Sequence, residues 1–235
     1  MDYMDRFKCR ISNDGVCNTV KYICSVSYNE IYEKLQNAYI DFKYSGRLLD
    51  GNHKTRYSHL GAHDIYHTDY SVLPLIFSKV NVISEDTLVD VGCGKGRVII
   101  YWLSKGYKNE IIGLELDPEI AGQTSNQFKR YRNVKIVNGD AIDNLPDNGT
   151  IFYCYNPFSY DIVEKFEQKA SSIANNNRVT IIYYNPRSID AFKANKWKIQ
   201  HLNFERDFGI KRWGRLNKYH DLAFISNDLA FISNN

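Results

Sequence analysis

The chain has 235 residues, of which 43% are hydrophobic and 24% are charged, and its net charge is +3. This length suits one large α/β domain with an N-terminal elaboration and excludes two full-sized domains. The apolar runs are too short to cross a bilayer, and the N-terminus lacks the apolar stretch of a secretory signal. We therefore expect a soluble cytoplasmic protein without a membrane partner.

The N-terminal third predicts helices separated by a long loop. The letters SYNE at 27–30 form a capping-box pattern, and apolar residues then recur at helical spacing over 31–42. Residues 43–69 are polar and aperiodic, which predicts a loop with short turns. A second helix is predicted over 70–80, with Pro74 in its first turn.

From residue 87 onward, the pattern alternates between strands and helices. Strands are predicted at 88–92, 110–115, 134–138, 150–155, 178–184, 197–204 and 222–225, and helices at 97–105, 118–130 and 161–174. Such alternation predicts a doubly wound, Rossmann-like, mostly parallel sheet with helices on both faces, preceded by an N-terminal helical extension. We expect the extension to cover 1–80 and the sheet domain 81–235, with a ligand crevice beyond the carboxyl ends of the strands.

The chain ends in a tandem repeat, because DLAFISN at 221–227 recurs without change at 228–234. A seven-residue copy is far shorter than the unit of a solenoid. We interpret the first copy as the last strand of the sheet and the second as a surplus tail.

The stretch LVDVGCGKGR at 88–97 lies where the crevice is expected, and its glycines are Gly92, Gly94 and Gly96. A Walker A loop is excluded because Lys95 is followed by glycine and arginine, not by serine or threonine. A dinucleotide fingerprint places its third glycine one residue later. Asp90 would also repel a pyrophosphate, whereas it would attract an ammonium or a sulfonium.

S-adenosylmethionine carries both of these cations and a carboxylate. That carboxylate suits the unpaired N–H groups at the start of the helix that follows Gly96. Lys95 and Arg97 are unfavourable to the helix dipole there unless an anion lies close by. A bound carboxylate would supply the anion, and solvated side chains are the alternative.

The residues from Asp90 to Gly96 resemble the first motif of class I S-adenosylmethionine-dependent methyltransferases. Three further motifs of that family follow in order, at the ends of predicted strands, over roughly residues 60–225. The resemblance implies that Asp90 and the three glycines bind the cofactor, that Glu115 in GLELDP receives its ribose hydroxyls, and that the adenine lies against VNGDAI. The last of these motifs contributes Asp140 and Ala141.

The fourth motif, YCYNPF, places Asn156 and Phe158 beside the transferring methyl group, in contact with the cofactor and with the acceptor. Nucleic-acid amine methyltransferases often carry two prolines here, whereas this chain has one. Its Asn-Pro-Phe is more similar to uncharacterised bacterial and non-SET protein lysine methyltransferases. In that group an entry segment covers the cofactor, which implies binding by Tyr66 and Thr68. The similar Tyr-Asn-Pro at 184–186 is interpreted as a strand end only.

The resemblance implies transfer of a methyl group to a protein amine or a small molecule by in-line displacement. Asn156 would accept a hydrogen bond from the attacking amine, and Phe158 would pack against the substrate. An RNA methyltransferase or a nucleic-acid-binding protein is the alternative, based on KRWGRLNKYH at 211–220, in which basic and aromatic residues interleave. A dinucleotide oxidoreductase conflicts with the glycine spacing. The motifs do not specify the acceptor or the oligomeric state.

Three histidines, His59, His63 and His67, would share one face of a helix. No carboxylate or cysteine stands clearly in register with them, so hydrogen-bonded loop histidines are favoured over a metal site and no metal is expected.

Overall fold

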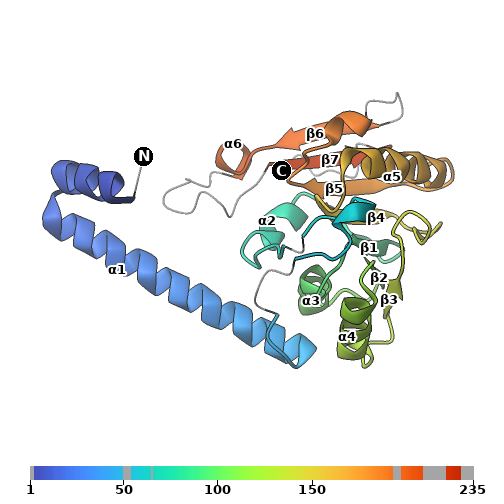
Figure 1. Cartoon of the computed structure of the whole chain (residues 1–235), viewed down its shortest axis with the longest axis horizontal. Helices are drawn as coiled ribbons and strands as arrows, with labels where there is room; N and C mark the ends of the chain where they lie inside the picture. Colours follow the sequence, from blue (N-terminus) through green and yellow to red (C-terminus); the bar gives the residue numbers. More distant parts are fainter. Residues whose placement is uncertain (1–2, 50–53, 65, 193–196, 209–220, 229–235) are drawn as a thin grey trace.

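The computed structural model describes the chain except for residues 1–2, 50–53, 65, 193–196, 209–220 and 229–235. Within the described residues, seven strands form one sheet in the order β3-β2-β1-β4-β5-β7-β6 (Figure 1). The strands are β1 Thr87–Val91, β2 Glu110–Glu115, β3 Val134–Asn138, β4 Ile151–Tyr155, β5 Thr180–Tyr184, β6 Lys198–Leu202 and β7 Leu222–Ser226. The neighbours from β3 to β5 are parallel, whereas β7 is antiparallel to β5 and β6. The predicted doubly wound, mostly parallel sheet is confirmed.

Helices cover both faces of this sheet. The α-helices are α1 Tyr3–Ser45, α2 Leu73–Phe77, α3 Arg97–Ser104, α4 Pro118–Phe128, α5 Tyr160–Ile173 and α6 Phe204–Phe208, and the 3-10 helices are η1 Ser58–Leu60 and η2 Ile189–Phe192. Side chains alternate along each strand, so β1 directs Leu88 and Val89 to opposite faces. Leu88 joins a buried cluster with α2 and α3, whereas Val89 joins one with α5. Each large apolar side chain buried in this way contributes roughly 1.5–3 kcal/mol to stability.

The predicted elements from residue 87 onward match the observed ones to within two residues at each end, and β2 and β3 match without any difference. The start of α4 shows why its prediction succeeded. Asp117 occupies the N-cap position, and its side chain accepts hydrogen bonds from the backbone N–H groups of Glu119 and Ile120, while Pro118 supplies a preset φ. These signals are local in the sequence.

The first copy of the tandem repeat forms a strand of the sheet. Residues 222–226 form β7, which lies between β5 and β6 and is buried along its length. Residues 229–234 of the second copy lie outside the described residues. The prediction that the first copy is the last strand is confirmed.

The predicted start of the N-terminal helix is wrong. Residues 27–30 lie inside α1, which begins at Tyr3, so Ser27 and Glu30 do not cap it. A capping box acts only where the preceding residues leave the helix, and residues 3–26 continue it. The second helix is present but shorter than 70–80, with Pro74 in its first turn as expected. Four residues ahead of it, Asp69 accepts hydrogen bonds from both the backbone N–H and the hydroxyl of Ser71, which favours a turn over a helix there.

The C-terminal end of α1 is attached to the sheet domain through Asp41. This buried carboxylate accepts hydrogen bonds from the Tyr70 hydroxyl (2.6 Å) and the Leu49 N–H (3.0 Å), and Arg97 of α3 lies 3.5 Å away. The rest of α1 stands away from the sheet in Figure 1. Among its described side chains, eight large apolar ones are exposed, namely Val16, Val20, Tyr28, Ile31, Tyr32, Leu35, Tyr39 and Phe42.

Residues 46–80 connect α1 to the sheet. Leu49, Tyr70 and Val72 share a buried cluster with Leu88 and the residues of α3. The division of the chain at residue 80, with the first part acting as a cofactor lid, stays a prediction. No helix in the described ranges combines the length and the apolar character that crossing a membrane requires.

Candidate active site

The turn between β1 and α3 is built from its three glycines. Gly92, Gly94 and Gly96 all have positive φ (75°, 52° and 82°), a conformation that glycine adopts without strain. A Cβ on Gly96 would lie 2.4 Å from the Phe128 ring, so glycine also permits α4 to approach the turn. Hydrogen bonds from the backbone N–H groups of Gly92 and Cys93 to the Leu114 carbonyl (3.0 and 2.8 Å) fix the turn against β2.

Glu115, the last residue of β2, lies beside this turn. One of its carboxylate oxygens accepts a hydrogen bond from the Gly94 N–H and the other from the Asp117 N–H, both at 2.9 Å. Burial raises the pKa of Glu115, and these two hydrogen bonds oppose part of the rise. Each carboxylate oxygen has two lone pairs, so both retain the capacity to accept a further hydrogen bond.

Asp90 forms a second buried carboxyl group, 3% exposed, near Glu115. Burial, and then the charge of Glu115, raise the pKa of Asp90 to about 8. Two acidic groups in a space of low dielectric favour a cation between or beside them. This is the electrostatic character that the sequence predicts for the site.

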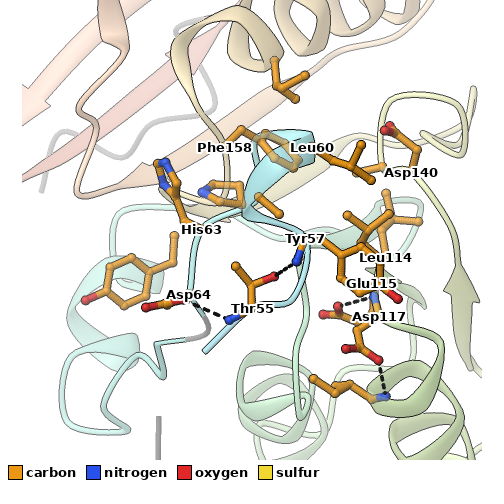
Figure 2. A pocket seen from close by; sticks show the side chains of 18 of the residues that line it. Thr55, Tyr57, Leu60, His63, Asp64, Leu114, Glu115, Asp117, Asp140 and Phe158 are labelled. Carbon is orange, nitrogen blue, oxygen red and sulfur yellow. Dashed lines mark hydrogen bonds between the residues drawn. The ribbon is translucent and has the colours of Figure 1, made fainter. Parts of the chain in front are cut away.

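A cleft, here called the main cleft, opens at the carboxyl ends of β1, β2 and β4 (Figure 2). Its walls are Gly92, residues 114–117, Ile120, residues 139–141, Tyr155, Pro157, Phe158 and Ile162, together with Thr55, Tyr57, Leu60, residues 62–64 and Tyr66 from the N-terminal segment. Six residues predicted from the sequence therefore line one cleft, namely Tyr66, Gly92, Glu115, Asp140, Ala141 and Phe158. Asp140 is exposed and accepts a hydrogen bond from the Ile142 N–H (2.7 Å), whereas Ala141 is buried.

Asp90 and Thr68 lie in a smaller space, here called the side hollow, which shares Tyr66, Gly92 and Tyr155 with the main cleft. The Thr68 hydroxyl is 2.6 Å from the Tyr153 hydroxyl and is buried. Thr68 therefore supports the floor of the site next to Asp90. Tyr66 is 54% exposed and lies at the rim, with its ring 6.4 Å from that of Tyr155.

The segment 55–64 forms one wall of the main cleft and is held in place by two sets of contacts. Ala62 pairs with Phe158 in an antiparallel bridge, and the Ser159 N–H donates to the Gly61 carbonyl (2.9 Å). At the other end, the Arg56 guanidinium binds the carboxylates of Asp117 and Glu119, each at 3.0 Å. No local sequence pattern predicts these ion pairs, because Arg56 and its two partners are 61 and 63 positions apart.

The Arg97 guanidinium already has an anionic partner within the protein. Its guanidinium lies 3.5 Å from the buried Asp41 carboxylate and 5.2 Å from the centre of the Tyr70 ring. The anion near the start of α3 is thus supplied by α1, and the expectation that a bound carboxylate or water would balance Arg97 is wrong. The prediction failed because the pairing of Arg97 with Asp41 depends on tertiary packing, which brings the end of α1 to α3.

Asn156 follows β4 with a φ of 39°, and it is buried. Its side-chain oxygen lies 3.2 Å from the Tyr183 hydroxyl, and its side-chain nitrogen lies 3.3 Å from His63 Nδ1. Asn156 lines a neighbouring space, here called the outer cleft, together with Thr55, Ser58, residues 62–64, Tyr66, Tyr155, Asn185 and Arg187. The main and outer clefts meet at residues 62–64, Tyr66 and Tyr155.

Asn185 corrects the interpretation of the second Asn-Pro pair. It follows β5 with a φ of 55° and lines the outer cleft beside Asn156. Asn185 therefore both follows the end of β5 and contributes a side chain to the wall of the outer cleft. The repeated Asn-Pro at the ends of adjacent parallel strands was the signal, because such ends meet at one edge of the sheet.

The three histidines do not share a helix face. Helix η1 ends at Leu60, and Gly61 with a φ of 82° turns the chain before His63. His63 is a hydrogen-bonded loop histidine, since its Nδ1 lies 2.9 Å from the Asn156 carbonyl oxygen. In the described part of the chain, no group of three or more His, Cys, Asp or Glu side chains is arranged to hold a metal ion.

Residues 88–171, from β1 into α5, match the family model described as a methyltransferase domain. Over this range, about a third of the chain, the sequence is similar to a methyltransferase domain. The matched range includes the glycine turn, Glu115, Asp140, Asn156 and Phe158. A search of curated proteins finds no significant match to the chain.

Solved structures with a similar fold include methyltransferases. The RNA methyltransferase from Salinibacter ruber, in complex with S-adenosyl-L-homocysteine, is 15% identical, with a TM-score of 0.49 and coverage of 72% of this chain and 98% of that chain. Precorrin-6y C5,15-methyltransferase from Geobacter metallireducens is 15% identical, with a TM-score of 0.47 and coverage of 68% and 87%. TrmN from Thermus thermophilus is 9% identical, with a TM-score of 0.51 and coverage of 68% and 49%. At such identities the likeness to TrmN concerns the fold alone.

Proposed function

We propose that the protein is a methyltransferase that uses S-adenosylmethionine as its methyl donor and transfers the methyl group to a protein amine or a small molecule. The donor would occupy the main cleft and the side hollow, and the acceptor would enter through the outer cleft. The observation that carries this proposal is the buried Glu115 carboxylate, which lies at the end of β2 within reach of both the glycine turn and the main cleft.

The residues present suit the chemical groups of this donor. Glu115 retains lone pairs for the two ribose hydroxyls, and Asp90 offers a buried acidic group to the ammonium. Asp140 and Ala141 would lie along the adenine, and Tyr66 and Gly92 would border the centre of the ligand. The same two acidic groups disfavour a pyrophosphate, which is why NAD does not suit the site.

When bound, the donor supplies an activated methyl group, and the protein contributes orientation and exclusion of water. Segment 55–64 lies over the main cleft and is held by the Ala62 bridge and by the Arg56 ion pairs. Asn156 and Phe158 would lie on the acceptor side and orient the nucleophile, which is the main requirement of an in-line displacement.

An RNA acceptor is the alternative. The basic and aromatic run at 211–220 on which it depends lies outside the described residues. Titration of the chain with RNA at increasing salt concentration distinguishes an RNA acceptor from a small one, because RNA binding weakens steeply as salt concentration rises.

The test is calorimetric titration of the full chain with S-adenosylhomocysteine and, separately, with NAD. We expect binding of the former alone. Glu115→Gln keeps the shape of the side chain but replaces one acceptor oxygen by a donor, so affinity should fall by about 1–3 kcal/mol. Asp143→Asn, an exposed acidic residue outside the main cleft, serves as the matched control and should leave affinity unchanged. Binding of NAD without S-adenosylhomocysteine would contradict the proposal.

A further inference from the structure

His63 lies where the main cleft and the outer cleft meet, and it lines both. Figure 2 shows it in the wall of the main cleft. Its backbone N–H donates to the Pro157 carbonyl (3.0 Å), and its ring nitrogen Nδ1 lies 2.9 Å from the Asn156 carbonyl oxygen. The residue is therefore fixed to the turn that follows β4 through both its backbone and its side chain. This turn is the one expected beside the transferring methyl group.

The contact with the carbonyl oxygen determines the tautomer of His63. A carbonyl oxygen only accepts hydrogen bonds, so Nδ1 carries the hydrogen and Nε2 of the neutral ring keeps a lone pair. The Asn156 side-chain amide lies 3.3 Å from the same Nδ1 and 3.2 Å from the Tyr183 hydroxyl. A half-turn of this amide presents its oxygen to Nδ1–H and its NH₂ group to the Tyr183 oxygen, which satisfies every one of these contacts. Asn156 is then a positioning residue for the imidazole.

We propose that His63 is the general base of the reaction and that the acceptor is a hydroxyl group of a small molecule bound in the outer cleft. The inference rests on the proposed methyltransferase function and specifies its acceptor. A neutral amine that attacks a sulfonium gives a stable ammonium and needs no base in the transition state. A hydroxyl would give a strongly acidic oxonium, so a base in contact with it lowers the barrier.

A lone pair of the acceptor oxygen forms the new O–C bond to the methyl group, and the S–C bond breaks with its electron pair going to sulfur, which becomes a thioether. The hydroxyl proton passes to Nε2 of His63, and the resulting imidazolium, stabilised by the Asn156 carbonyl at Nδ1–H, later releases that proton to water.

The walls of the outer cleft indicate the kind of hydroxyl compound. The rings of Tyr66 and Tyr155 lie 6.4 Å apart at 45° to each other, and they offer flat apolar faces of the kind on which a sugar or a phenol packs. Asn185 and Arg187 supply polar groups on the same cleft. This composition suits a hydroxylated ring.

The tautomer can be measured without any cofactor or substrate. Long-range ¹H–¹⁵N spectra of the full chain with ¹⁵N-labelled histidine should show His63 with the hydrogen on Nδ1, and His63→Ala assigns the signal. His59, whose ring lies 6.4 Å from that of Tyr57, provides the internal comparison. A His63 ring that carries its hydrogen on Nε2 would overturn the inference whether or not the protein binds S-adenosylmethionine.

The chemistry is tested with S-adenosylmethionine labelled in its methyl group and the small-molecule fraction of a cell extract. Label in products that pass through a cation exchanger, as ethers do, supports the hydroxyl assignment, whereas label only in retained methylamines overturns it. His63→Ala should lower the single-turnover rate by a factor of roughly 10²–10⁴ and leave S-adenosylhomocysteine affinity within a few-fold, with partial rescue by added imidazole. His59→Ala is the matched control and should behave as the unaltered chain.

These readouts separate the two proposals. If S-adenosylhomocysteine binds and His63→Ala transfers methyl groups at the unaltered rate, only the role of His63 is overturned. If S-adenosylhomocysteine does not bind, the proposed function is overturned and the reaction assigned to His63 falls with it.

Discussion

The Asp90→Asn variant tests the electrostatics of the donor site most directly. Because burial and the charge of Glu115 raise the pKa of Asp90 to about 8, only about one tenth of this group is ionised at pH 7 in the free protein. The ammonium of S-adenosylhomocysteine favours the ionised form, so binding should release close to one proton at pH 7. Affinity should rise about tenfold per pH unit, or about 1.4 kcal/mol, between pH 5.5 and 7.5.

The assay is titration calorimetry in buffers of different ionisation enthalpy, which counts the protons released. Asp90→Asn keeps the shape of the protonated group and cannot ionise, so both the proton release and the pH dependence should disappear. Wild-type affinity that is constant between pH 5.5 and 7.5, with no proton released, would refute the reasoning.

The same pKa shift predicts how the free protein responds to pH. The folded-state pKa of Asp90 lies above the ordinary value of about 3.9, so between about pH 4 and 8 the folded protein retains a proton that the unfolded chain has released. The unfolding free energy should therefore fall as pH rises through this window, and the fall should be smaller in Asp90→Asn. Denaturant unfolding at several pH values measures it, and equal slopes in the two proteins would contradict the assignment.

Three further predictions follow from the structure. Asn156→Ala should leave S-adenosylhomocysteine affinity within a few-fold and lower single-turnover methyl transfer by a factor of roughly 10–1,000, and joint loss of both would place Asn156 in the donor site. Gly96→Ala sets a methyl group 2.4 Å from the Phe128 ring at a φ of 82°, so it should destabilise the fold by about 1–3 kcal/mol more than Gly106→Ala, which has a φ of 78° and open space, and equal melting temperatures would contradict this. Deletion of residues 229–235 should hardly change the melting temperature because β7 is the first copy of the repeat, and a large fall would show that the second copy is needed.

Parts of the fold and of the site could be predicted because their causes are local. The glycines at 92–96, the proline at the start of α4 and the short apolar runs of β1 to β5 act on their immediate neighbours, and their element bounds were close to those observed. The parallel order of the strands then brings Glu115, Asp140 and Phe158 to one edge of the sheet. That is why residues from three motifs line the main cleft.

The remaining features depended on contacts between residues far apart in the chain. The Arg97 guanidinium is balanced by Asp41, 56 positions earlier, and the Thr68 hydroxyl lies against Tyr153, 85 positions later. No local pattern encodes either distance.

The position of His63 in the candidate active site also depends on a contact between residues far apart in the chain. The spacing of the histidines could only raise the question of a metal, because a periodic pattern assumes that the segment is helical. The positive φ of Gly61 and the bridge from Ala62 to Phe158 instead place His63 against Asn156, 93 positions away. The sequence by itself determined which strands end in chemically active residues. Only the packing of segment 55–64 onto the turn after β4 decided that His63 lines both clefts, since that packing is a tertiary contact.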